Sequence, residues 1–406
     1  MNWLAIFLGL LCCGLVALDA VQTVVIPRRA TGRFRITRFF FVFTWKPWVF
    51  LGERLRSHKL REQFYGVYGP ISLIFLLLFW ASLLIFGFAL ILFGLGSPFQ
   101  DATLPPGHHP LLRFLTDIYV SGTSLTTLGP GDVVPRRQSA RLLMILESAT
   151  GLGLVALVIS YVPVLYAAFS RREVSVALLD ARAGSPPTAA ELLTRHGFEG
   201  GQVALITLLA EWERWAADIL ESHISYPVLC YYRSQHDNQS WLSALTTILD
   251  VCALLITTIE GPASRQAQLT FAIARHAVVD LGHVFHIESE ELTLFNVTGT
   301  NRLTDTTFAR LCNTLAAVDI GLCTDSNSAH RLLAIRQLYE PRAQALADYL
   351  CMPLPHWISD PRASDQWRKV SSLRFGALGD KVSVNIEHIS SESTAMNLHD
   401  TETHSL

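Results

Sequence analysis

Apolar residues gather in three long stretches within the first 170 positions of the chain. Ile71–Leu95 contains no charged residue at all. Trp3–Ile26 contains only Asp19, and Leu142–Phe169 contains only Glu147. Because a membrane-spanning helix needs about 20 largely apolar residues, the pattern predicts three such helices.

The pattern changes beyond the third stretch, where apolar residues recur at intervals of three and four, as on one face of an α-helix. Gly184–Ser185–Pro186–Pro187 is expected to end the preceding helix, and Thr188 with Glu191 forms a capping box that begins another. The spacing continues in Val203–Leu220, Trp241–Ile256, Ala267–Leu281, Phe308–Leu315 and His330–Leu350. We therefore expect an all-α membrane protein.

Five parts follow from these patterns: an N-terminal transmembrane helix over 1–27, a basic segment over 28–68, a membrane domain over 69–172, a cytoplasmic α-helical domain over 173–365 and a tail over 366–406. The tail is rich in Ser, Thr and His, and this composition predicts disorder. The first helix is interpreted as a retained anchor, because it lacks the basic start of a signal peptide, has only a poor small-residue cleavage site and runs too long before Arg28 and Arg29.

Charged residues make up only 16% of the chain and are placed unevenly. The basic segment between the first two stretches is rich in Lys and Arg, with only Glu53 and Glu62 opposing them. The positive-inside rule places this segment in the cytoplasm. We therefore expect a multi-pass protein of the cell membrane whose N-terminus lies on the outer side. Within it, Phe34–Phe50 mixes Arg with aromatic residues, which is typical of an interfacial amphipathic helix, with a plain linker as the alternative.

A re-entrant pattern lies between the second and third stretches. Residues 111–125 are apolar enough to enter a membrane but too few to cross it. Non-helical backbone persists at membrane depth only where it lines water or is covered by protein, and glycine lets successive carbonyls point to one side. The sequence therefore predicts a half-helix aimed at a carbonyl-lined ion filter. The filter candidates are Thr126, Thr127, Leu128, Gly129, Pro130, Gly131 and Asp132.

These residues resemble the two-transmembrane potassium-channel-like family, whose filter is Thr-Val-Gly-Tyr-Gly-Asp. The likeness is closest to bacterial members with a Leu-Gly-x-Gly-Asp motif, which here is Leu128 to Asp132. The resemblance implies a homotetramer in the lipid bilayer with one pore loop per chain. It also implies K⁺ or another monovalent cation as the permeant ion, and no cofactor.

Pro130 stands where the family has tyrosine. Its carbonyl remains, but an aromatic ring and one backbone N–H donor are lost. Three alternatives stay open: a potassium-preferring channel, a non-selective cation channel, and a membrane-anchored sensor or scaffold that keeps the fold without conduction.

Further candidates lie in the third stretch. Gly151 stands where the family has a hinge glycine, and Gly153 follows it, although close helix packing would also explain both. Pro163 is expected to bend the helix, either as part of a gate or as a static kink. Glu147 could face the pore cavity or pair with an arginine such as Arg141.

Four polar groups outside this stretch have open roles. Asp132 could stay ionised at the pore mouth or bond back to the preceding half-helix, and Asp19 could pair with a base or sit in a packed interface. His283 and His286 could share a helix face and ligate a metal, or be spaced so by chance.

The sequence contains none of the common motifs of soluble enzymes or zinc proteins. There is no P-loop or dinucleotide fingerprint and no zinc spacing among the cysteines, so neither an enzyme nor a metal protein is expected. We expect no nucleic-acid partner, and the sequence does not identify a ligand of the cytoplasmic domain.

Overall fold

The computed structural model describes residues 2–24, 36–101, 109–234, 239–259, 261–287, 301–318, 320–322 and 325–359. Within these ranges the regular structure is almost entirely helical. Strands β1 (Phe99–Asp101) and β2 (Val133–Pro135) form one short antiparallel pair, with Phe99 opposite Pro135. The predicted fold class, an all-α membrane protein, is confirmed.

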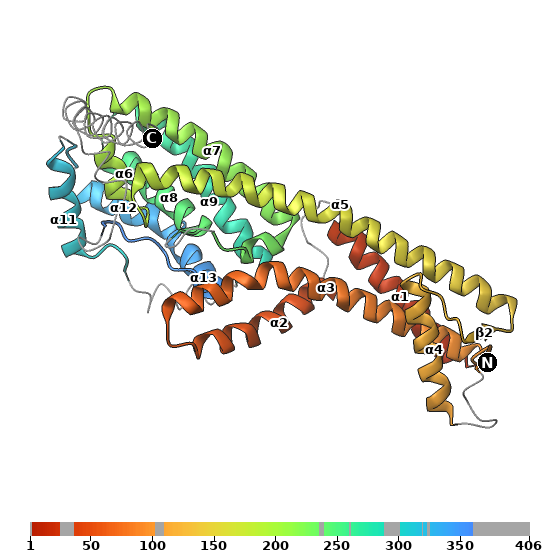
Figure 1. Ribbon diagram of the computed structural model, residues 1–406. Helices are drawn as coiled ribbons and strands as arrows, with labels where there is room; N and C mark the ends of the chain where they lie inside the picture. Colours follow the sequence, from red (N-terminus) through yellow and green to blue (C-terminus); the bar gives the residue numbers. More distant parts are fainter. Residues whose placement is uncertain are drawn as a thin grey trace, which may run out of the picture.

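In the described part of the chain, three helices are long and apolar enough to cross a membrane: α1 (Trp3–Val24), α3 (His58–Gly94) and α5 (Gln138–Ala183). They contain the three predicted stretches, except that 25–26 lie outside the described residues and Leu95 caps α3. At about 1.5 Å per residue, α3 and α5 are roughly 55 and 69 Å long, well beyond a hydrocarbon core of about 30 Å. Both therefore project out of the bilayer, and α5 runs most of the length of the molecule (Figure 1).

The far half of α5 carries the helical unit, which we define as the helices from α6 to α13 (Figure 1). Gly184, with φ of 85°, ends α5, and the Thr188 hydroxyl accepts a hydrogen bond from the Glu191 backbone N–H, as the capping box predicts. The unit comprises α6 (Ala189–Arg195), α7 (Gly201–Ser225), η1 (Pro227–Tyr231), α8 (Trp241–Thr257), α9 (Ala263–Val284), α11 (Asp305–Ala316), α12 (Ser326–Gln337) and α13 (Glu340–Leu350).

Helix α8 is the centre of this unit, since every residue in it except Ile256 is buried. One prediction needs correction: His330–Leu350 is two helices, α12 and α13, rather than one. Pro341 lies in the first turn of α13, where its missing N–H costs nothing, whereas in the interior of one long helix it would break the hydrogen-bond ladder. The predicted tail lies outside the described residues.

Helix α2 (Ile36–Glu53) packs between the membrane helices and the helical unit. Trp45 is 3% exposed, and its indole N–H donates to the carbonyl of Tyr349, 304 positions away, at 2.9 Å. The Asp19 carboxylate accepts from the backbone N–H of Thr37 and from the indole of Trp80. Asp19 therefore lies in a packed interface, and its charge faces the positive end of α2.

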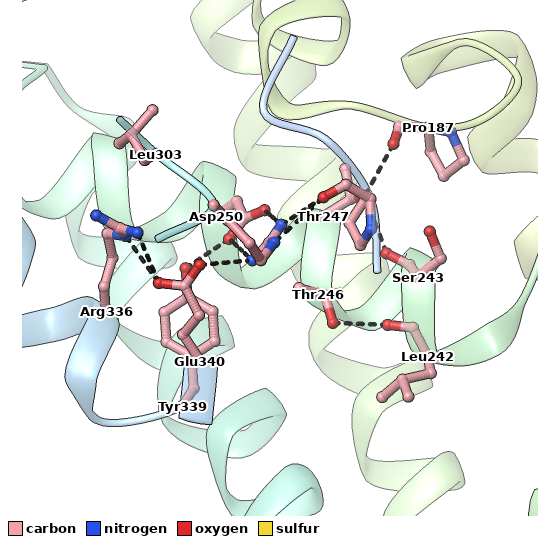
Figure 2. A network of polar contacts seen from close by, with 12 residues as sticks. Pro187, Leu242, Ser243, Thr246, Thr247, Asp250, Leu303, Arg336, Tyr339 and Glu340 are labelled. Atoms are coloured by element: carbon pink, nitrogen blue, oxygen red, sulfur yellow. Dashed lines mark hydrogen bonds and ion pairs between the residues drawn. The ribbon is translucent and has the colours of Figure 1, made fainter. Parts of the chain in front are cut away.

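A buried ionic network joins α8 to α13 (Figure 2). Asp250, which has no exposed surface, accepts from Arg302 Nη2 at 2.6 Å and from the Tyr339 hydroxyl at 2.5 Å. Glu340 pairs with Arg302 at 3.2 Å and with Arg336 at 2.8 Å. Burial alone would lower the pKa of Arg302, but the charges of Asp250 and Glu340 outweigh it and raise that pKa. The network thus keeps its charges because each one is paired.

Replacing Asp250 tests how far the helical unit depends on this network. Asp250→Ala leaves the Arg302 guanidinium buried with one of its two carboxylates missing, and we expect a loss of about 3–5 kcal/mol of stability. Chemical unfolding followed by tryptophan fluorescence, to which the nearby Trp357 contributes, measures it. Arg182→Ala, which breaks an exposed ion pair with Glu211, is the control and should cost less than about 1 kcal/mol. Equal losses for the two variants would contradict a structural role for the network.

Candidate pore and filter segment

Helix α4 (Pro110–Leu125) is the predicted half-helix. Pro110 occupies its first turn, and the His109 imidazole accepts from the backbone N–H of Leu111. Its 16 residues span about 24 Å, which is less than the bilayer core. Helix α4 lies beside α3 and α5 at the end of the molecule away from the helical unit (Figure 1).

Serine side chains fix α4 between its neighbours. Ser121 Oγ donates to the carbonyl of Ile85 in α3 at 2.9 Å, and Ser148 Oγ in α5 donates to the carbonyl of Ser124 at 2.8 Å. Val120 has no exposed surface. The C-terminal end of α4, where the helix dipole is negative, is therefore held in place just before the filter segment, residues Thr126 to Asp132.

The backbone of the filter segment alternates in handedness. Thr127 and Gly129 have φ of 59° and 74°, whereas Leu128, Pro130 and Gly131 are outside the left-handed region. The backbone N–H groups of Leu128 and Gly129 both donate to the Thr123 carbonyl, at 2.9 and 3.0 Å. Gly129 thus has a backbone conformation that favours glycine, whereas Gly131 does not.

The filter segment is poorly covered within one subunit. Leu128 is 81% exposed, and Thr126, Thr127, Gly131 and Asp132 are exposed as well. One contact ties its far end to α4: the Tyr119 hydroxyl donates to Asp132 Oδ1 at 2.9 Å. Of the two alternatives for Asp132, the structure thus supports the hydrogen bond back to the half-helix, with Tyr119 as the partner.

Two buried carboxyl groups lie in the helices on either side of the filter segment, one in α4 and one in α5. Glu147 has no exposed surface, and its Oε1 is hydrogen-bonded to Ser121 of α4. Among the described residues Glu147 thus contacts Ser121 rather than an arginine, and its burial within one subunit argues against a place on the pore cavity. Asp117, buried in α4, accepts from Ser97 Oγ at 2.6 Å. Sequence reasoning missed Asp117, although an acid within an apolar half-helix was a usable signal.

The two glycines of α5 differ in their surroundings. A Cβ at Gly151 would lie 1.9 Å from the carbonyl oxygen of Leu125, the last residue of α4, whereas a Cβ at Gly153 would meet nothing within 4 Å. Close packing is therefore the role that the structure gives Gly151. Pro163 is exposed inside α5, which continues through it to Ala183.

One face of α5 presents apolar side chains that no other part of the described chain covers. They recur at intervals of three and four, so they form one stripe along the helix. The stripe consists of Leu152, Val155, Ile159, Val162 and Tyr166, each at least 40% exposed.

Arg172 anchors α5 in the helical unit and was missed as a functional candidate. It has no exposed surface and donates to the carbonyls of Leu229 and Tyr232 at 2.9 and 2.8 Å. Its Nη1 also lies 3.2 Å from His223 Nε2. Burial and the Arg172 charge hold the pKa of His223 well below its usual value, so His223 is neutral and accepts from Arg172.

Comparison with known families agrees with this geometry. Residues 75–166 match the family model described as an ion channel, Ion_trans_2. The matched residues run from Phe75 in α3 through α4 and the filter segment to Tyr166 in α5, so the predicted resemblance to a pore-loop ion channel family is confirmed. The helical unit lies outside the match. No curated protein and no solved structure matches the chain.

Matched substitutions at the two glycines separate packing from bending. Gly151→Ala places a methyl group against a backbone carbonyl and should destabilise the protein by about 1–3 kcal/mol. Gly153→Ala is the control, because it has open space and alanine favours helix by up to about 1 kcal/mol. Thermal unfolding of the detergent-purified protein compares them. Unchanged stability of Gly151→Ala would show that the close contact with Leu125 is not maintained.

Proposed function

We propose that this chain, whose residues 75–166 form a pore-loop ion channel domain, is the subunit of a tetrameric cation channel that prefers potassium. The observation that carries the proposal is the filter segment itself. It follows a half-helix, has positive φ at Thr127 and Gly129, and is largely exposed within the described part of its own subunit. Four copies around an axis would give the segment both its cover and its ion path.

The local electrostatics favour a cation. The carbonyl groups at the end of α4 point toward the filter segment and carry the negative end of the helix dipole. The backbone N–H groups of Leu128 and Gly129 both donate to the Thr123 carbonyl, so the carbonyl oxygens of these two residues are left to replace the water around a cation.

Support for the filter segment comes from the half-helix in this protein. Pro130 has neither an aromatic ring nor a backbone N–H with which to contact the residues behind it. The Tyr119–Asp132 hydrogen bond supplies one contact of that kind from α4. This link supports the potassium preference over a non-selective pore.

The helical unit is proposed to regulate the pore. Helix α5 carries the exposed apolar stripe and continues without a break to Arg172 and beyond. The buried contacts of Arg172 with Leu229, Tyr232 and His223 join it to the helical unit, so a displacement of that unit moves α5.

Ion flux tests the function directly. The purified protein in liposomes is expected to pass K⁺ down its gradient faster than Na⁺, because the carbonyl segment replaces the hydration shell of K⁺. A fluorescent potential indicator measures flux under each gradient in turn. Flux of neither ion would favour the sensor or scaffold without conduction, and equal flux of both would contradict potassium preference.

Two substitutions test the filter segment. Pro130→Tyr restores an N–H donor and the aromatic ring of the family pattern, so it should raise the potassium-over-sodium permeability ratio while current persists. Gly129→Ala should lower the ratio or abolish current, because a side chain penalises its φ of 74°. Reversal potentials under bi-ionic conditions measure both. Unaltered reversal potentials in both variants, with current intact, would show that ions do not pass this segment.

Adjacent arginines test the regulation. Arg172→Gln removes the charge that joins α5 to η1 and α7, and should change open probability without changing ion preference. Arg171→Gln makes the same charge change at a side chain that is 60% exposed and serves as the control, because its 3.6 Å ion pair with Asp218 of α7 is exposed and contributes little. Single-channel recording measures both quantities. Normal gating of Arg172→Gln would contradict coupling through this anchor.

A further inference from the structure

A cavity of about 590 Å³ lies where the membrane helices meet the helical unit. Its size is within the range of ligand-binding pockets. Thr23, Leu73 and Tyr161 line it from α1, α3 and α5, and Tyr231 and Tyr349 line it from η1 and α13. Its walls therefore come from both parts of the molecule.

Most of the cavity wall is apolar. Leu73, Leu76 and Val228 line it and are at most 7% exposed. The hydroxyls of Tyr231 and Tyr349 are 3.0 Å apart and hydrogen-bond to each other, so neither of them requires a hydrogen bond from a ligand. Such a wall suits a hydrocarbon chain, which gains free energy for each methylene group removed from water.

The cavity also has a cationic edge on α2. Arg38, Val42 and Lys46 are spaced four apart, so they lie on one face of the helix, and all three are exposed and line the cavity. Within the described ranges, neither cation forms an ion pair or hydrogen bond. The acid among the lining residues, Asp348, instead accepts from Gln344 Nε2 at 2.9 Å. Arg38 and Lys46 therefore present two positive charges at the cavity that are suited to contact an anionic group.

The position of the cavity identifies where such a ligand would come from. Thr23 lies in the last turn of α1, a candidate span of only 22 residues, so the cavity is at the membrane surface on the side of the helical unit. Lipid headgroups lie at this level, and basic pockets between membrane helices favour anionic ones.

We propose that the cavity binds an anionic phospholipid of the adjoining leaflet. An acyl chain would lie among Leu73, Leu76 and Val228, and the phosphate would contact Arg38 and Lys46. A zwitterionic lipid would leave the two cations without a net counter-charge, and a small soluble anion would leave the apolar wall empty. Because walls of both parts contact one ligand, the bound lipid would join α2 and α3 to the helical unit. The proposal does not depend on ion conduction.

Native mass spectrometry of the detergent-purified full-length protein tests the proposal. The probes are phosphatidylglycerol, phosphatidylcholine with the same acyl chains, and oleate. We expect phosphatidylglycerol to bind once per subunit and at least tenfold more tightly than phosphatidylcholine, because two basic residues contact its net charge. Equal binding of the two phospholipids, or binding of oleate without phosphatidylglycerol, would overturn the proposal.

Variants locate the binding. The double variant Arg38→Gln with Lys46→Gln changes only exposed side chains and should lose about tenfold or more in affinity for phosphatidylglycerol. Ala345→Trp fills the cavity without changing charge and should reduce binding as well. Arg54→Gln with Lys59→Gln removes the same charge outside the lining and should bind as the unmodified protein does. An equal loss in this control, or full binding by the Arg38 and Lys46 variant, would show that any basic surface suffices.

Discussion

A backbone amide or carbonyl at membrane depth must find a partner in protein, water or an ion, because lipid offers none. The helices α1, α3 and α5 meet this requirement internally. The filter segment between α4 and α5 does not, since it leaves the helical hydrogen-bond ladder after Thr126. Four of its N–H groups, those of Thr126 to Gly129, donate to carbonyls at the end of α4, and its own carbonyls are left for other groups. A single subunit is therefore incomplete at this position.

Much of the membrane part serves to hold that segment in place. Ser121 contacts both Ile85 of α3 and Glu147 of α5, so one hydroxyl ties the half-helix to both of its neighbours. Gly151 lets α5 approach the carbonyl of Leu125 directly. Rigid positioning from behind is what a carbonyl path for ions requires, because a side chain or backbone displaced by a fraction of an ångström changes the coordination.

The sequence predicted the elements that depend on local pattern. The three spans, the half-helix and the capping box at Thr188 follow from length, hydropathy and side-chain hydrogen bonding, and they appear where expected. The places of Glu147 and Trp45 could not be predicted in this way. Each depends on which distant element packs against it: Ser121 of α4 for Glu147, and Tyr349 of α13 for Trp45. Gly129 and Gly131 are the same residue type with similar sequence neighbours, so only the backbone of the structure shows which of them has positive φ.

The central claim is that the filter segments of four copies enclose an ion path. The most direct measurement is a cryo-electron microscopy structure of the full-length protein in lipid nanodiscs with K⁺. We expect four subunits with Thr127, Leu128 and Gly129 of each beside a common axis, and ion density on that axis within coordination distance of their carbonyls. An assembly whose filter segments face lipid, or lie apart from any shared axis, would contradict the account.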